Sequence, residues 1–240
     1  MKISFITIAP SLIESCFKNT ILNKALENKY IKLEIINLRD FGKGKYKQID
    51  DSPFGGGAGM VMMADPILKA IEFSIKKMDI KSEDANIFYP TAQGKVWKQS
   101  DALSHTGNKN IIFICGRYKG IDQRITDNYV THEYSIGDYI ITNGEISSIV
   151  IADSIVRLIP GTLNNLESAR TDSFYSDLLD SPHYTHPRSF QGWQVPKVLL
   201  SGHHKNINEW KNKQSEILTK MKRPDLWKKF KEINNENGVC

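Results

Sequence analysis

Apolar residues in the first two thirds of the chain alternate between short continuous runs and helically spaced positions. The runs predict buried strands at Met1–Ile8, Leu33–Leu38, Asn86–Thr91 and Asn110–Cys115. The helical spacing predicts helices at Ser11–Lys29, Ala64–Met78, Trp97–Ser104 and Glu145–Ile159. Because strands and helices alternate, we expect an α/β domain with a mostly parallel sheet.

Some segments have a less regular pattern. Arg39–Gly59 is a long stretch with three lysines, three aspartates and six glycines, and loops of this length inside compact domains are usually functional. Tyr134–Thr142 has the composition of a strand that Gly137 interrupts. The segment Glu145–Ile159 is apolar on nearly every side, so we expect a buried helix there.

The pattern changes after the pair Pro160-Gly161, which ends that helix. Thr162–Asp172 is polar and predicts a mobile linker. A stretch rich in Pro, His and Tyr then leads to two predicted helices, Ile207–Met221 and Pro224–Asn234. We therefore expect a small α-helical domain after the α/β domain.

Charge is unevenly distributed along the 240 residues, whose net charge is +5. From His186 to Cys240, eleven Lys and Arg stand against five Asp and Glu, a balance of +6. The preceding residues hold twenty-one against twenty-two, a balance of −1. A phosphate-binding segment would need such an excess. On charge alone, a solvated lysine-rich helical face explains it equally well.

Several functional classes lack their usual signals in this sequence. No run approaches the roughly 18 apolar residues of a membrane span, and the N-terminus has no signal-peptide cleavage site. Cys16, Cys115 and Cys240 lie far apart without a CxxC pair, which disfavours disulfides and a zinc site and indicates a reducing, cytoplasmic compartment. There is no GxxxxGK[ST], no GxGxxG after the first strand and no HExxH, and the six histidines lack ligand spacing. Metal catalysis by protein ligands is therefore not expected.

Glycine-bearing turns end three of the strand-like segments, at Asn86–Gly94, Cys115–Gly120 and Ile136–Gly144. Ligands of parallel α/β sheets lie at the carboxyl ends of strands, so these turns could converge on an adenosine-sized molecule. Taken singly, each is more often only a strand terminus. The cluster Gly55–Gly59 has four glycines in five residues, and their entropic cost favours a function over a merely flexible turn.

Six longer motifs are more specific. They are DDSPFGGGAGMVM (Asp50–Met62), ICGRYKGID (Ile114–Asp122), SIGDYIITNGE (Ser135–Glu145), LIPG (Leu158–Gly161), DSPHYTHP (Asp180–Pro187) and VLLSGHH (Val198–His204). In order and spacing they resemble the bacterial tRNA (guanine-N1)-methyltransferases, the TrmD family of the SPOUT superfamily. The resemblance extends from Met1 to about Trp227.

The resemblance implies methyl transfer from S-adenosylmethionine to N1 of the guanine immediately 3′ of the anticodon, tRNA position 37. It implies a trefoil-knotted SPOUT-type domain, which sequence physics alone would reject because knots are nearly absent among folds. It also implies a homodimer whose active site is shared across the interface, and it associates magnesium with the reaction. The implied organisation is a knotted catalytic domain at residues 1–161, a linker carrying the catalytic Asp at 162–175, and a helical tRNA-binding domain at 176–240.

The resemblance also assigns site residues. Those of the donor cleft are Thr91, Gly94, Gly116, Ile136, Gly137, Asp138, Tyr139, Ile140, Ile141 and Gly144. Asp172 matches the base that removes the proton from guanine N1, and Arg157 would stabilise the negative charge on O6. Simpler interpretations exist: Arg157 could form a helix ion pair with Asp153, and Asp172 could cap a helix that begins at Ser173.

The chain departs from the family pattern at several positions. Lys119 stands where the family usually carries a glutamate (GRYEG), which reverses a charge near the donor pocket. Ala92 replaces a proline, Asn143 replaces the first glycine of a GGE, and Phe54 replaces a tyrosine. Two alternatives to the main interpretation are a related SPOUT methyltransferase acting on another RNA site and a non-catalytic RNA-binding protein. The presence of both proposed catalytic residues disfavours the latter.

Overall fold

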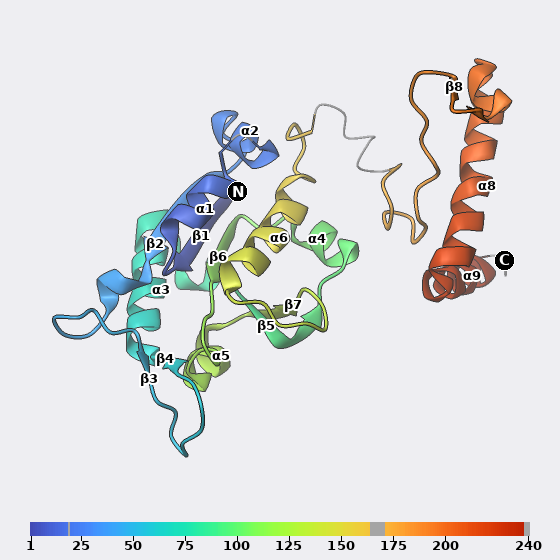
Figure 1. Cartoon of the computed structure of the whole chain (residues 1–240). Coiled ribbons are helices and arrows are strands. Elements are labelled where there is room, and N and C mark those ends of the chain that lie inside the picture. Colours follow the sequence, from blue (N-terminus) through green and yellow to red (C-terminus); the bar gives the residue numbers. More distant parts are fainter. Residues whose placement is uncertain (19, 164–170, 238–240) are drawn as a thin grey trace. The chain divides into compact units, whose positions relative to one another are not determined.

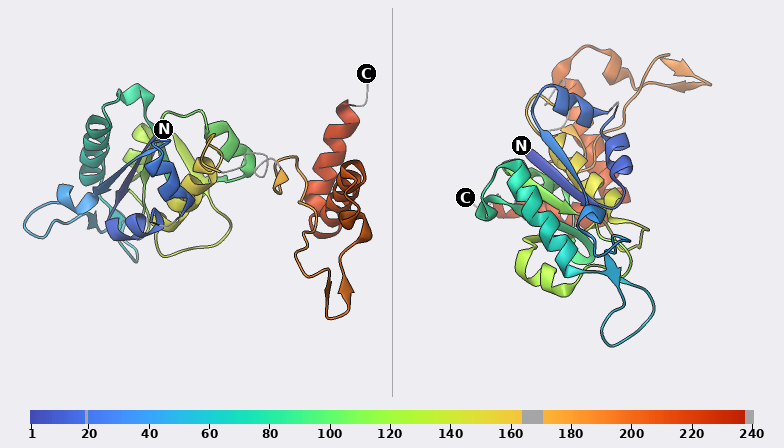
Figure 2. Two further views of the ribbon diagram at one scale, coloured as in Figure 1. Left: turned by 90° about the horizontal axis from the view of Figure 1, so that it is seen from above. Right: turned by 90° about the vertical axis from the view of Figure 1, so that its left-hand side faces the viewer.

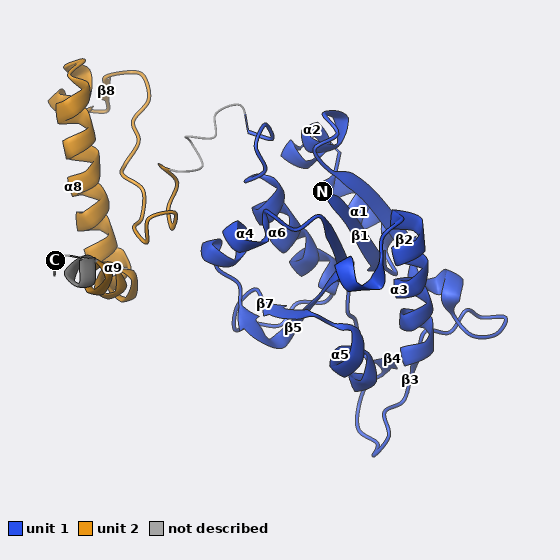
Figure 3. Cartoon of the chain, turned by 180° about the vertical axis from the view of Figure 1, so that it is seen from behind, with its two compact units in different colours: residues 1–164 blue, residues 165–240 orange. Residues whose placement is uncertain are grey.

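The computed structural model describes residues 1–18, 20–163 and 171–237 (Figure 1). The chain divides into two compact units, Met1–Asn164 and Asn165–Cys240 (Figure 3). No helix in the described parts combines the length and the apolar character needed to cross a bilayer.

Five parallel strands form the sheet of the first unit, in the order β2-β1-β6-β5-β7 (Figure 1). They are β1 (Lys2–Thr7), β2 (Lys32–Asn37), β5 (Asn86–Val96), β6 (Asn110–Ile114) and β7 (His132–Ser135). Every residue of the central strand β6 is buried, as its continuous apolar sequence requires of a strand covered on both faces. The prediction of an α/β domain with a mostly parallel sheet is confirmed.

Helices lie on both sides of this sheet (Figure 2). On one side, α3 (Ala64–Met78) contacts β1, β2 and α5 (Gln123–Tyr129). On the other side, α6 (Gly144–Val156) contacts β5 and β6 and three further helices: α1 (Pro10–Cys16), α2 (Ile21–Glu27) and α4 (Gln99–His105).

The alternation of side chains along the strands divides the core into two layers. Ile6 and Ile114 belong to the aliphatic cluster that packs under α3. Their neighbours Phe5 and Phe113 stack on each other with ring centroids 4.9 Å apart, and Phe5 also packs on Phe17, which follows α1. The sheet is therefore held from both faces, and its strand ends are fixed in position.

The single helix predicted at Ser11–Lys29 is wrong, because the structure has two short helices there, α1 and α2. Thr20 is extended at the start of α2, with φ −129° and ψ 177°. Its hydroxyl donates a hydrogen bond to the carbonyl of Cys16, at 3.0 Å. A polar side chain that bonds nearby backbone competes with the helix, which explains the break.

Further differences lie near the strand ends. β5 runs five residues beyond the predicted Thr91, with a register shift against β7 between Pro90 and Lys95. The strand predicted at Tyr134–Thr142 is wrong, since β7 ends at Ser135 and a loop follows. The helix α5 and two 3-10 helices, η1 (Leu38–Phe41) and η2 (Ser82–Asp84), were not predicted.

The glycine cluster lies in a loop between two short antiparallel strands. β3 (Asp50–Asp51) pairs with β4 (Val61–Met62), and the cluster lies between them. Positive φ angles at Gly55, Gly56, Gly57 and Gly59 explain why glycine is needed at these positions.

The second unit begins its described part at Thr171. A two-stranded hairpin, β8 (Ser189–Phe190) and β9 (Trp193–Gln194), precedes η3 (Lys197–Leu200). Two helices follow, α8 (His204–Lys222) and α9 (Pro224–Asn237), which pack on each other and include the two helices predicted from the sequence. The hairpin was not predicted. Most of the segment predicted to be a mobile linker, residues 164–170, lies outside the described residues.

Candidate active site

A pocket of about 200 Å³ opens beyond the carboxyl ends of β6 and β7 and beside the middle of β5, where the register against β7 shifts. It is lined by residues 89–92, 116–120, 134–137 and 139–144, together with Ser147 of α6. The structure thus brings together the glycine-bearing turns that follow β6 and β7, whereas the segment expected to turn at Gly94 continues as strand β5. The parallel direction of β6 and β7 explains this convergence, because their carboxyl ends meet at one edge of the sheet.

Two glycines allow the walls of the pocket to approach each other closely. The N–H of Gly144 donates to the carbonyl of Gly116 at 2.8 Å. A Cβ on Gly144 would lie 2.5 Å from the Gly116 nitrogen, and a Cβ on Gly116 would lie 2.8 Å from the ring of Tyr89. The turn after β6 and the start of α6 can therefore pack this closely only when both residues lack a side chain.

Most of the residues predicted for the donor cleft line this pocket. They are Thr91, Gly116, Ile136, Gly137, Tyr139, Ile140, Ile141 and Gly144. Gly94 lies within β5 instead, where a Cβ would come 2.4 Å from the backbone nitrogen of Tyr134. Asp138 belongs to the loop after β7 but does not line the pocket.

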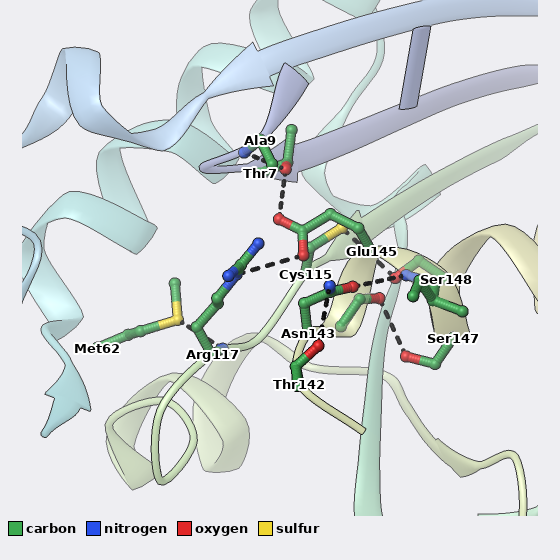
Figure 4. A network of polar contacts seen from close by, with 12 residues as sticks. Thr7, Ala9, Met62, Cys115, Arg117, Thr142, Asn143, Glu145, Ser147 and Ser148 are labelled. Carbon is green, nitrogen blue, oxygen red and sulfur yellow. Dashed lines mark hydrogen bonds and ion pairs between the residues drawn. The ribbon is translucent and has the colours of Figure 1, made fainter. Parts of the chain in front are cut away.

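A buried charge lies behind the pocket wall (Figure 4). Glu145, in the first turn of α6, is fully buried. Its Oε1 accepts a hydrogen bond from the hydroxyl of Thr7 at 2.6 Å, and its Oε2 lies 3.5 Å from Nε of Arg117. The positive end of the helix dipole also favours a carboxylate at this position. Glu145 was not predicted as a site residue, although a carboxylate in the first turn of a nearly wholly apolar helix indicates a buried polar contact.

The chain before α3 is tied to the pocket by backbone hydrogen bonds. The N–H of Lys119 donates to the carbonyl of Met60 at 3.0 Å. The N–H of Met62 donates to the carbonyl of Gly120 at 3.0 Å, and Asp122 N–H donates to the Met62 carbonyl at 2.9 Å. The end of the glycine-rich loop therefore runs along the segment that forms one wall.

A hydrogen-bonded histidine supports the wall at Tyr134. His105 Nε2 lies 2.8 Å from the Tyr134 hydroxyl, and its Nδ1 lies 2.9 Å from the side-chain nitrogen of Asn108. Because the amide nitrogen of Asn108 can only donate, Nδ1 of the neutral imidazole accepts and Nε2 carries the proton. Burial lowers the pKa of His105, and burial also lowers the pKa of neighbouring His132. The wall is therefore built on neutral imidazoles.

The two predicted catalytic residues belong to different units. Arg157 follows α6 directly, and its N–H donates to the carbonyl of Asp153 at 3.0 Å. Burial raises the pKa of the Asp153 carboxyl, and the charge of Arg157 opposes this shift. Asp172 lies half-buried in the second unit. The described residues contain no group of three or more His, Cys, Asp or Glu side chains placed to hold a metal ion.

These features define an α/β protein with a pocket where two strands of a parallel sheet end, the usual place for a ligand site in such folds. Residues 1–229 match the family model described as tRNA (Guanine-1)-methyltransferase TrmD. The chain belongs to this family.

Named relatives agree with the family. The tRNA (guanine-N(1)-)-methyltransferase of Clostridioides difficile is 46% identical over 232 residues, which cover 97% of this chain and 100% of the relative. The same-named protein of Christiangramia forsetii is 46% identical over 228 residues, 94% of this chain and 98% of the relative. The same-named protein of Oceanobacillus iheyensis is 42% identical over 239 residues, which cover 100% of this chain and 96% of the relative. The prediction of a tRNA (guanine-N1)-methyltransferase is confirmed.

Proposed function

We propose that this enzyme transfers the methyl group of S-adenosylmethionine to N1 of the guanine at tRNA position 37, immediately 3′ of the anticodon. One observation carries the proposal: the pocket where the glycine-bearing turns after β6 and β7 meet beside β5. Four glycines in its lining, Gly116, Gly120, Gly137 and Gly144, let an adenosine-sized ligand approach the main chain closely. When bound, the donor supplies an electrophilic methyl group on a sulfonium.

The proposed donor site consists of the pocket-lining residues of the predicted cleft. Gly94 contributes indirectly, because it lets β5 pack closely on β7 at the pocket wall. Asp138 lies between two lining residues, Gly137 and Tyr139, and would act from the rim. The close contact of Gly116 with Gly144 fits this role, since it holds the turn after β6 against the start of α6 at the pocket wall.

In the proposed reaction, guanine N1 loses its proton as the methyl group arrives. The Asp172 carboxylate accepts that proton, because protonated N1 is a poor nucleophile. The guanidinium of Arg157 stabilises the negative charge that develops on O6. The bond from N1 to the methyl carbon forms as the bond from that carbon to sulfur breaks.

We further propose a homodimer in which Asp172 of one subunit completes the pocket of the other. The pocket and Asp172 belong to different units of the chain, which is compatible with delivery across an interface. The proposal includes a trefoil knot of the SPOUT type in residues 1–161 and a linker at 162–175. It assigns tRNA binding to residues 176–240, whose basic excess suits phosphate contacts.

Transfer of labelled methyl groups to tRNA transcripts tests the proposed function. Transcripts with guanine at position 37 should accept the label, and transcripts that differ only by adenine there should not. Label on both transcripts, or on neither, would contradict the proposal. Within the described residues, no three His, Cys, Asp or Glu side chains lie together where they could hold a magnesium ion. A parallel reaction with EDTA measures the metal requirement.

Subunit mixing tests the shared site. One inactive variant carries Asp172→Ala, and the other carries Gly116→Leu, which places a side chain where Tyr89 already lies. Random exchange gives half heterodimers, each with one doubly defective and one intact site. The mixture should regain about a quarter of wild-type activity by this counting. Demonstrated exchange without recovery would show that each site is built within one chain.

A further inference from the structure

Two cationic residues line the pocket, Arg117 and Lys119, and no carboxylate is part of its lining in the described residues. They differ in their surroundings. Arg117 lies 3.5 Å from the fully buried carboxylate of Glu145, which balances its charge (Figure 4). Lys119 is exposed, and the described parts of the chain show no ion pair to it. The nearby acid Asp122 is engaged by Arg124 at 2.7 Å. Asp138 lies between two lining residues but is not part of the lining, and no ion pair joins it to Lys119 in the described residues. Lys119 is therefore the cation of the described lining that has no carboxylate bound to it.

Contacts with the glycine-rich loop hold Lys119 at this position. Its backbone N–H bonds the carbonyl of Met60, and its side-chain stem lies against Gly59. A Cβ on Gly59 would come 3.0 Å from Cγ and 3.2 Å from Cε of the lysine. The absence of a side chain at residue 59 thus makes room for the stem.

The two ligands of a methyl-transfer pocket differ by one charge. The donor carries a sulfonium cation, whereas the product S-adenosylhomocysteine carries a neutral thioether in nearly the same shape. A cation in the wall repels the sulfonium and leaves the thioether unaffected. We infer that Lys119 shifts the selectivity of this pocket from the donor towards the demethylated product. This inference rests on the proposed donor site.

The size of the effect follows from the repulsion of two like charges in a partly solvated pocket. At a separation of about 10 Å, with an effective dielectric constant between about 20 and 80, such a repulsion changes a binding constant by about two- to fifteenfold at low salt. Neutralising the lysine should therefore favour the donor over the product by about fivefold. Reversing its sign should have a larger effect, and both effects should shrink at high salt.

Calorimetric titration of wild type and variants with S-adenosylmethionine and S-adenosylhomocysteine tests the inference without a turnover assay. The variants are Lys119→Gln and Lys119→Glu. Lys109→Glu is the matched control, because Lys109 precedes β6 while the pocket opens beyond its other end. In both Lys119 variants, we expect the dissociation constant of the donor to fall relative to that of the product. In the control, the ratio of the two dissociation constants should stay unchanged.

The outcomes separate the inference from the proposed function. Unchanged ratios in Lys119→Glu, with both ligands still bound, would overturn the role of the lysine and leave the donor site intact. Equally weakened binding of both ligands would also overturn the role of the lysine, because Lys119 would then contact a chemical group that donor and product share. If wild type binds neither ligand, the proposed donor site itself is wrong.

Discussion

Replacing Glu145 by glutamine tests whether the buried carboxylate stabilises the pocket as a charge. The side chain is fully buried, bonds the Thr7 hydroxyl at 2.6 Å and lies 3.5 Å from the Arg117 guanidinium. Glutamine keeps the size of the side chain and an acceptor for the hydroxyl, but it removes the charge. The variant therefore separates electrostatics from packing.

The expected loss follows from three contributions. A hydrogen bond to a charged group is worth about 1.5–3 kcal/mol, against about 1 kcal/mol for a neutral one. The carboxylate at a helix N-terminus adds about 0.3–1 kcal/mol. Removing a buried charge also removes its desolvation penalty, which offsets part of the loss. Because the side chain of Arg117 is 28% exposed and can be hydrated, we expect a net loss of about 1–2 kcal/mol.

Native-state hydrogen exchange of the α6 amides measures this loss of stability in the first unit alone. All variants are compared at the same protein concentration. Glu14→Gln is the control, because Glu14 is an exposed acid of α1 and its replacement should change stability by less than about 0.5 kcal/mol. Glu145→Ala should cost more, about 3–4 kcal/mol, since it also leaves a cavity and an unsatisfied hydroxyl. If the α6 amides exchange as slowly in Glu145→Gln as in wild type, the charge contributes nothing to stability.

Three further predictions follow from the structure. Gly144→Ala should weaken donor binding at least about tenfold in calorimetry while α6 stays folded, because the added methyl group meets the Gly116 backbone. His105 and His132 have lowered pKa values, so the folded state binds fewer protons than the unfolded state. The contribution of these two groups to stability should therefore be fully present above about pH 6.5. Below that pH, the free energy of unfolding measured in urea should fall by up to about 2.7 kcal/mol per pH unit, about 1.4 kcal/mol for each histidine. The variant His105→Gln should show a weaker dependence on pH. Replacing Lys220 and Lys222 by glutamate should reduce the salt slope of tRNA binding by about two, whereas an unchanged slope would mean a merely solvated helix face.

Much of the fold was predictable from local pattern. The helix Ala64–Met78 has both of its predicted bounds, because its apolar positions keep one helical phase throughout. The strand at Asn110–Ile114 is continuously apolar and correspondingly central in the sheet. The predicted strand Tyr134–Thr142 failed because its apolar residues line a pocket instead of a core. Periodicity cannot distinguish these two kinds of apolar surface.

The candidate site was predictable in part. Strand ends and glycines indicated where the pocket would form, because parallel strands place their turns at one edge. The contact between Thr7 and Glu145 was not predictable, since 138 residues separate them and no local pattern links them. The same holds for the histidine behind Tyr134, whose role depends on a neighbouring strand. Such contacts depend on the tertiary packing of segments that are far apart in the sequence, so no local sequence pattern predicts them.

The polar network explains why the recognisable motifs of this chain are long and dispersed. Thr7 comes from the end of β1, Glu145 from α6, Arg117 from the turn after β6 and Met62 from β4 (Figure 4). The Arg117 N–H contacts the Met62 sulfur at 3.1 Å, so each segment reaches the pocket through its neighbour. A buried charge that loses its partner destabilises the fold. A substitution in one of these segments therefore changes the stability of the contacts in the others. Lys119 lies at an exposed position of this wall, where the sign of a charge can change without leaving a buried group unpaired. This is why we expect its effect in ligand selectivity and not in stability.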